Sequence, residues 1–254
     1  GKEFVKYLRS KKISYKCVNF YKHDISLNKI CPDEEIKKIN KCKYFIHFAS
    51  SLNPKTDQDF LFNEKIPNYI HKKINKKVFF IYISSINVLI KDRVDKYSKS
   101  KLKAEVLFES NKNLTIIRLP LVFKFEKKKI INIGPAKRIF TAIDFFPFFV
   151  PCIYPGNIYN PIDVLKLNKF LLEILKKKIK KKYYNILGLK QFNFFEIVKS
   201  ISDSKNKIIL KINICFIKSK FPKFINTFFK KQNNFLNQFA QINNSKIKKK
   251  ISYL

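Results

Sequence analysis

The apolar run at residues 78–83, Val-Phe-Phe-Ile-Tyr-Ile, constrains the fold of this chain more than any other feature. Six consecutive apolar residues offer neither face of a strand to water, so the run predicts a strand that is buried on both faces. Such strands occur in parallel sheets that helices cover on either side. We therefore expect an α/β protein built around this strand.

Helical and strand patterns alternate on both sides of this run. The helical segments are residues 2–11, a helix that starts at Pro32, a helix that starts at Pro67, and residues 97–110. The strand segments are residues 13–18, 44–48 and 114–118. This order is typical of a Rossmann-like parallel sheet with helices on both faces.

After residue 121 the pattern weakens. Residues 123–161 are rich in loop signals, and a helix at 162–178, a strand at 183–186 and a helix at 194–201 follow, with no consistent period beyond Ile217. We expect a Rossmann-like domain at residues 1–121 and, at 122–254, a mixed α/β substrate lobe, some segments of which return to the Rossmann sheet.

The chain is strongly basic, with 54 Lys+Arg against 18 Asp+Glu and a formal charge of +36. Such a balance normally suggests nucleic acid or an anionic membrane surface as partner. Arginine, which makes the bidentate contacts to nucleic acid, is rare in this chain. Lysine is abundant along the whole chain, and so are Ile, Asn and Phe. We interpret the charge as coding drift and expect no nucleic-acid partner. A basic nucleic-acid or membrane-surface protein stays the alternative from another class.

No segment has the pattern of a signal peptide or of a membrane-spanning helix. The most apolar window, residues 139–153, is interrupted by Asp144, Pro147 and Pro151. We expect a buried loop or lobe segment there, and contact with a membrane surface is the alternative. The five cysteines show neither a CxxC pair nor metal spacing, which predicts reduced thiols in a cytoplasmic protein without a metal site.

Tyr97 and Lys101 are four residues apart and share one face of the expected helix. An ammonium beside a tyrosine hydroxyl stabilises the phenolate and lowers a pKa that is ordinarily about 10, so Tyr97 could act as a general base or acid. Ser84 and Ser85 follow the buried strand, at the carboxyl end where open α/β sheets place their sites. A serine there can bind the same substrate oxygen as the tyrosine.

The order strand, Ser-Ser, Tyr-x-x-x-Lys and then Ile-Ile-Arg-Leu-Pro at 116–120 resembles the short-chain dehydrogenase/reductase superfamily. Its extended branch, the nucleotide-sugar epimerases and dehydratases, fits best. The resemblance implies that Ser85 orients the substrate oxygen, that Tyr97 exchanges the proton, and that Lys101 lowers the tyrosine pKa and binds the nicotinamide ribose. It also implies NAD or NADP as the hydride carrier and a nucleotide-activated sugar as the substrate, with a homodimer left open.

Further segments match that family in order. Residues 23–25 resemble the segment that meets the adenine ring, residues 44–49 resemble the strand that lies along the cofactor, and Asn63 falls where the family has a structural asparagine. Residues 160–163 and 184–188 resemble later family segments. The cofactor-binding residues that the resemblance implies are Gly1, Asp24, Ile25, Phe48, Ala49, Ser50, Tyr97, Lys101 and Pro120. We interpret His47 as a core residue, and Arg118 fits a structural ion pair equally well.

Three departures from the family bear on activity. No GxxGxxG turn is present, and Gly1 stands where the last glycine of that turn would be, so we expect the chain to start inside the motif and to lack the first strand. Ser85 and Tyr97 are only twelve positions apart, and Leu89 replaces a usual tyrosine. The short spacing resembles the atypical branch, which includes an accessory subunit of respiratory complex I, so a catalytically silent dinucleotide-binding protein is the alternative. Asn19 lies in the region of the acidic residue that holds the NAD ribose, so NADP stays open.

Overall fold

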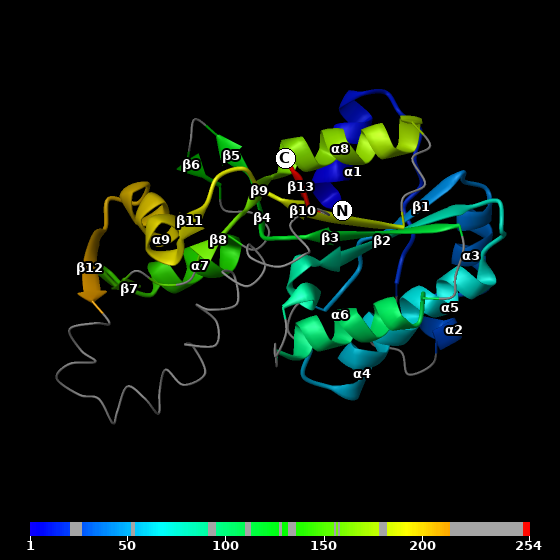
Figure 1. The fold of residues 1–254 in the computed structure, drawn as a ribbon, viewed down its shortest axis with the longest axis horizontal. Coiled ribbons are helices and arrows are strands. Elements are labelled where there is room, and N and C mark those ends of the chain that lie inside the picture. The colour runs from blue at the N-terminus through cyan, green and yellow to red at the C-terminus, as the bar shows by residue number, and fades with distance from the viewer. Residues whose placement is uncertain are drawn as a thin grey trace. The chain divides into compact units, whose positions relative to one another are not determined.

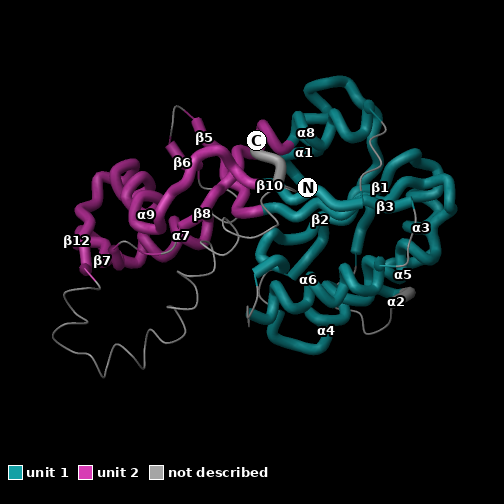
Figure 2. Tube along the Cα trace, viewed as in Figure 1, with its two compact units in different colours: residues 1–119, 168–186 teal, residues 120–167, 187–254 magenta. Residues whose placement is uncertain are grey.

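The computed structural model describes residues 1–20, 27–51, 54–90, 95–109, 113–126, 129–131, 136–154, 156, 158–177, 182–213 and 251–254. Two compact units make up the chain (Figure 2). Unit 1 joins Gly1–Leu119 with Asn168–Ile186, and unit 2 joins Pro120–Leu167 with Leu187–Leu254.

The main sheet has the strand order β1-β2-β3-β10-β13. Its strands are β1 (Tyr44–His47), β2 (Phe79–Ser85), β3 (Leu114–Leu119), β10 (Tyr183–Leu187) and β13 (Ile251–Tyr253). The neighbours from β1 to β10 pair in parallel. Nearly every residue of β2 is buried, which confirms the strand expected from the apolar run at 78–83.

Helices cover both faces of this sheet (Figure 1). On one face lie α1 (Lys2–Ser10) and α8 (Val164–Lys177), joined by a hydrogen bond of 3.3 Å from Asn168 Nδ2 to the Glu3 carbonyl. The other face carries α2 (Leu27–Ile30), α3 (Asp33–Asn40), α4 (Asp57–Phe60), α5 (Ile66–Lys73) and α6 (Lys96–Val106). The expected Rossmann-like architecture is confirmed.

The helix that we expected to start at Pro67 begins ten residues earlier, at Asp57. A capping box formed by Thr56 and Asp59 opens it, and a π-helical segment, η1 (Leu61–Lys65), joins α4 to α5. Pro67 therefore lies inside a continuous helical run, near the start of α5. The wider π turn shifts the hydrogen-bond ladder just before a residue that has no N–H to donate.

The strand expected at residues 13–18 is absent, because no described residue pairs with this segment. A strand exists only through its ladder of hydrogen bonds, and an alternating pattern alone cannot supply the partner. Val18 and Phe20 still pack against the apolar core of unit 1. In the described part of the chain, β1 is an edge strand.

Unit 2 has an apolar core of its own, to which α7, β7 and α9 contribute. Its elements are β4 (Val122–Phe123), β5 (Phe125–Glu126), β6 (Lys129–Ile130), α7 (Ala136–Asp144), β7 (Phe149–Tyr154), β8 (Ile158–Tyr159), β9 (Ile162–Asp163), β11 (Phe192–Asn193), α9 (Phe194–Asp203) and β12 (Ile208–Asn213). Residues 123–161 thus hold a helix and several strands where we expected loops. Most of these strands have two residues, too few for a period to show.

The window at residues 139–153 is a segment of the unit 2 lobe, one of the two forms that we expected, and it is not a buried loop. It forms the second half of α7, a turn and most of β7, and several of its phenylalanines are exposed. Among the described residues, no helix is long and apolar enough to cross a membrane.

Candidate functional site

The carboxyl end of β2 carries two buried serines. β2 runs through Ser85, which pairs in register with Leu119 of β3. Ser85 then begins a 3₁₀ helix, η2 (Ile86–Leu89), and its Oγ accepts a hydrogen bond of 3.3 Å from the Asn87 N–H. Ser84 Oγ is buried without a partner in the described part of the chain. A free hydroxyl therefore lies where a parallel sheet places its ligands.

Helix α6 packs against both β2 and η2. Asp95 caps it by accepting a hydrogen bond of 2.9 Å from the Ser98 N–H, which fixes the first turn, where Tyr97 lies. The Tyr97 side chain is hydrogen-bonded to the side chain of Ser50, in the loop after β1. Burial raises the pKa of Tyr97, and the hydrogen bond to Ser50 opposes that rise.

Lys101, one turn after Tyr97, is almost completely buried, with 1% of its surface exposed. Its Nζ donates a hydrogen bond of 3.0 Å to the Ile83 carbonyl. The same nitrogen is 4.7 Å from the centroid of the Tyr82 ring and 5.9 Å from that of the Tyr97 ring. Burial lowers the pKa of Lys101 to about 7, and the negative charge of Glu105 opposes this shift.

The effect that we expected Lys101 to have on the pKa of Tyr97 stays a prediction. An ammonium that stabilised the phenolate would lower the pKa of Tyr97, but that pKa is raised by burial. The Lys101 ammonium is instead hydrogen-bonded to the backbone of Ile83. Tyr97 therefore carries its proton in this arrangement and can donate it.

A network centred on Asn63 joins the loop after β1 to α6. Asn63 Oδ1 accepts hydrogen bonds from the Ser51 N–H at 2.7 Å and from Ser50 Oγ at 3.1 Å. Its Nδ2 donates to the Ser51 carbonyl at 2.9 Å and to Ser100 Oγ at 3.1 Å. Ser100 Oγ donates in turn to the Tyr97 carbonyl at 2.8 Å. Asn63 has the structural role that its position suggested, and it holds Ser50 within reach of Tyr97.

The sequence missed Ser100 as part of this network. A serine three residues after Tyr97 on a helix can return a hydrogen bond to the carbonyl at i−3, so a signal was present. The resemblance implied Ser50 as a cofactor-binding residue, and its contact with the Tyr97 hydroxyl was not foreseen.

The other residues expected at the cofactor lie in several places. Phe48 packs beside Gly1, with a separation of 3.6 Å between Phe48 Cβ and the point where a Gly1 Cβ would lie. Ala49 packs against the core of unit 1. Pro120 directly follows β3 and is the first residue of unit 2. Asp24 and Ile25 lie outside the described residues.

His47 is a core residue, as expected. It is fully buried, its ring stacks on those of Phe80 and Tyr82, and Phe20 contacts it edge-on. Burial, together with the positive charge of Lys101, lowers the pKa of His47 to about 3. The imidazole is therefore neutral across the physiological range.

Arg118 forms an ion pair with Glu105, a residue that the sequence did not single out. Arg118 Nη2 is 2.5 Å from Glu105 Oε2, and Arg118 Nε is within 3.2 Å of both carboxylate oxygens. Arg118 Nη1 also donates to Asn185 Oδ1 at 3.3 Å. Because Glu105 lies four residues after Lys101 on α6, the pair places a buried carboxylate beside the buried ammonium.

Neither a protein-family model nor a curated protein matches this sequence. Solved structures do match the fold. The dTDP-4-dehydrorhamnose reductase of Bacillus anthracis in complex with NADP has 16% identity and a TM-score of 0.63, over 85% of this chain and 81% of that one. The dTDP-glucose 4,6-dehydratase of the same organism, in complex with NAD, has 17% identity and a TM-score of 0.59, over 84% and 81%.

The UDP-glucose 4-epimerase of Thermotoga maritima with UDP-glucose is also similar, with 13% identity and a TM-score of 0.60 over 83% of this chain and 82% of that one. The reductase, the dehydratase and the epimerase share the parallel sheet with flanking helices. The chain therefore shares the fold of these three enzymes, a Rossmann-like parallel sheet with flanking helices.

Proposed function

We propose that this chain is an NAD(P)-dependent enzyme that acts on a nucleotide-activated sugar as an epimerase, dehydratase or reductase. One observation carries the proposal: Lys101, buried on α6 one turn after Tyr97, donates to the last backbone carbonyl before the two serines that end β2. The likeness of the fold to a reductase, a dehydratase and an epimerase of nucleotide sugars supports it.

The polar groups at this edge of the sheet suit the ribose of a dinucleotide. An ammonium has three N–H donors, and Lys101 directs one to Ile83. Ser84 Oγ is buried and has no partner among the described residues. Lys101 and Tyr97 would hold the ribose hydroxyls of NAD or NADP, which would supply the hydride when bound.

The proton would come from Tyr97. Because its pKa is raised, Tyr97 carries its proton at neutral pH and can donate it to the substrate oxygen. Ser85, at the end of β2, would orient that oxygen. Ser50, already hydrogen-bonded to Tyr97, would relay a proton from solvent to the tyrosine between turnovers, regaining from solvent the proton that it gives.

A second function is favoured by the same contacts. The hydrogen bond from Lys101 to Ile83 and the raised pKa of Tyr97 leave the tyrosine poorly suited to act as a base. A protein with this arrangement could bind a dinucleotide without turnover. In that case the chain would be a catalytically silent binding protein of the same fold.

Fluorescence titration with NADH and NADPH, followed by assays of UDP- and dTDP-linked sugars by mass spectrometry, tests both functions. For the enzyme, we expect Tyr97→Phe to lower turnover by about a hundredfold or more while changing the cofactor Kd by less than about threefold. Tyr69→Phe, on α5, is the control for loss of a tyrosine hydroxyl and should keep wild-type turnover.

The outcomes separate the two functions. Cofactor binding without conversion of any sugar would favour the silent binding protein. If neither dinucleotide binds, both functions are wrong.

A further inference from the structure

Between α7 and β7 the chain forms an aromatic turn, residues 145–148, with the sequence Phe-Phe-Pro-Phe. The exposed fractions are 84% for Phe145 and 72% for Phe148, and Phe149, the first residue of β7, is 50% exposed. Large aromatic side chains that gather on a surface mark an interaction site more often than single exposed apolar residues do.

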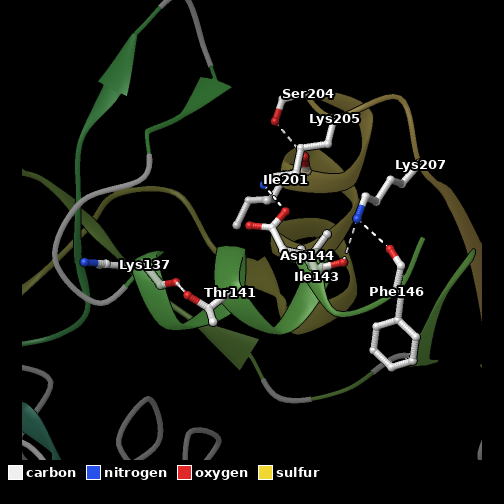
Figure 3. Close-up of polar contacts among 9 residues, drawn as sticks. All are labelled: Lys137, Thr141, Ile143, Asp144, Phe146, Ile201, Ser204, Lys205 and Lys207. Carbon is white, nitrogen blue, oxygen red and sulfur yellow. Dashed lines mark hydrogen bonds and ion pairs between the residues drawn. The ribbon is translucent and has the colours of Figure 1, made fainter. Parts of the chain in front are cut away.

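Two lysines fix the conformation of this turn (Figure 3). Lys207 Nζ donates hydrogen bonds to the carbonyls of Ile143 at 2.9 Å and Phe146 at 2.5 Å, at the end of α7. Lys205 forms an ion pair with Asp144, the last residue of that helix. Cations at a helix C-terminus satisfy its free carbonyls and stabilise its dipole. The lysines therefore fix the backbone of the turn.

One phenylalanine of the turn, Phe146, attaches the turn to the core of unit 2. Phe146 packs against the core of unit 2, and its ring meets that of Phe145 edge-on at 5.7 Å. The Phe148 carbonyl accepts a hydrogen bond of 3.0 Å from the Ile208 N–H, which ties the end of the turn to β12. Phe146 is partly buried against the core and the backbone is held on both sides, so the Phe145 and Phe148 side chains are left to solvent.

The exposed apolar surface continues onto the sheet of β7 and β12. Phe149 pairs in register with Ile208, and Pro151 pairs with Leu210. These four side chains are exposed, with fractions of 60% for Ile208 and 49% for Leu210, whereas the alternate residues of β7 are buried in the core. We name the following residues together the apolar face: Phe145, Phe148, Phe149, Pro151, Ile208 and Leu210.

We propose that the apolar face docks unit 2 on the surface of an anionic lipid membrane. Side chains of this kind bury about 5–10 Å deep, at the boundary of headgroups and acyl chains. The charge of the chain complements such a surface, since 54 Lys+Arg stand against 18 Asp+Glu. Within unit 2, Lys137 and Arg138 are exposed on α7, the helix that leads into the aromatic turn.

The composition of the face favours lipid over nucleic acid. Single-stranded nucleic acid stacks its bases on aromatic rings, and phenylalanine alone would serve that purpose. Ile208 and Leu210 offer no ring on which a base could stack, but they gain from transfer into hydrocarbon as the phenylalanines do. Lysine, which dominates the positive charge, attracts lipid phosphate without the bidentate geometry that base readout requires.

Sedimentation with lipid vesicles tests the proposal on the full chain. We expect the protein to bind vesicles of phosphatidylcholine with about one-third phosphatidylglycerol, and to bind pure phosphatidylcholine vesicles about tenfold less tightly or worse. The variant Phe145→Ser/Phe148→Ser should bind the anionic vesicles about tenfold less tightly than wild type. Leu165→Ser/Leu189→Ser removes two exposed leucines outside the face and should bind within about twofold of wild type.

Circular dichroism shows whether each variant is folded, and titration with oligo-dT tests the competing partner. The proposal is wrong if the serine variant and wild type bind anionic vesicles equally, or if neither binds. It is also wrong if the phenylalanine substitutions weaken binding of oligo-dT but not of vesicles. Phe145→Trp gives a second readout, because a docked indole should show blue-shifted emission with anionic vesicles and no shift without them.

Discussion

Lys101 Nζ lies 3.0 Å from the carbonyl oxygen of Ile83, near the carboxyl end of the buried strand β2. The contact gives a buried ammonium one backbone acceptor, and burial lowers the pKa of Lys101 from 10.5 to about 7.

The buried Lys101 should make the free energy of unfolding depend on pH. Between about pH 7 and 10.5, the unfolded chain binds a proton at this lysine that the folded chain does not, so the free energy of unfolding rises with pH over that window. Lys101→Met should remove this rise, which amounts to about 3–5 kcal/mol. Urea unfolding at several pH values measures it. Lys103→Met, an exposed lysine on the same helix, is the control, and identical slopes for Lys101→Met and wild type would contradict the prediction.

His47 should lower the stability of the folded protein in acid. Its pKa is lowered from 6.5 to about 3. Between these pH values the unfolded chain binds a proton at His47 and the folded chain does not, so the free energy of unfolding falls as pH drops from about 6.5 toward 3. His47→Phe keeps an aromatic ring in the stack and should be more stable than wild type by about 2 kcal/mol at pH 5, relative to their difference at pH 8. Thermal unfolding at both pH values checks this. His71→Phe, on α5, controls for loss of an imidazole, and an equal gain there would count against the assignment.

The Arg118–Glu105 pair should show strong coupling. Arg118→Leu leaves a buried carboxylate without its partner and should cost about 3–5 kcal/mol of unfolding free energy. The double variant Glu105→Leu/Arg118→Leu should recover part of that loss, because neither member of the pair is then buried without the other. A double-mutant cycle in urea measures the coupling. Additive effects of the two substitutions would show that the pair is not coupled.

Asn63 should matter for both stability and binding. Asn63→Leu leaves the Ser51 N–H and Ser100 Oγ without their bonds to Asn63, and we expect a loss of about 2–3 kcal/mol. Because Ser50 would lose its support beside Tyr97, NAD(P)H binding should weaken as well. Asn40→Leu removes one exposed hydrogen bond on α3 and should cost less than about 1 kcal/mol in urea unfolding. Equal losses for the two variants would argue against a central role for Asn63.

Gly188→Ala should damage unit 2. A Cβ at this position would lie 1.9 Å from the Pro161 carbonyl oxygen, while Gly188 and Asn160 exchange hydrogen bonds across the same contact. Backbone must move to relieve the overlap, so we expect a loss of about 3 kcal/mol or more. Leu189→Ala, at the exposed neighbour, is the matched control. A Gly188→Ala protein with the wild-type Tm would contradict this packing.

Most of the central sheet could be predicted from the sequence, because long buried strands leave continuous apolar runs. The pattern at 78–83 located β2, and the helical spacing around Tyr97 located α6 to within a residue at its start. Short elements were missed for the opposite reason, since two-residue strands such as β4 and β9 carry no period. The segment at 13–18 had the pattern of a strand but no partner, and a ladder needs both.

By itself, the sequence determined which side chains share a face, because a spacing of four on a helix and of two on a strand is fixed by local geometry. It therefore placed Tyr97 and Lys101 together on α6 and put Ser84 and Ser85 at the end of β2. Only the tertiary structure decided what those groups do. Burial and the Ile83 carbonyl set the charge of Lys101, and the loop after β1 supplied Ser50 to Tyr97. A pKa depends on solvent exclusion and on partners from distant segments, and spacing along one helix contains neither.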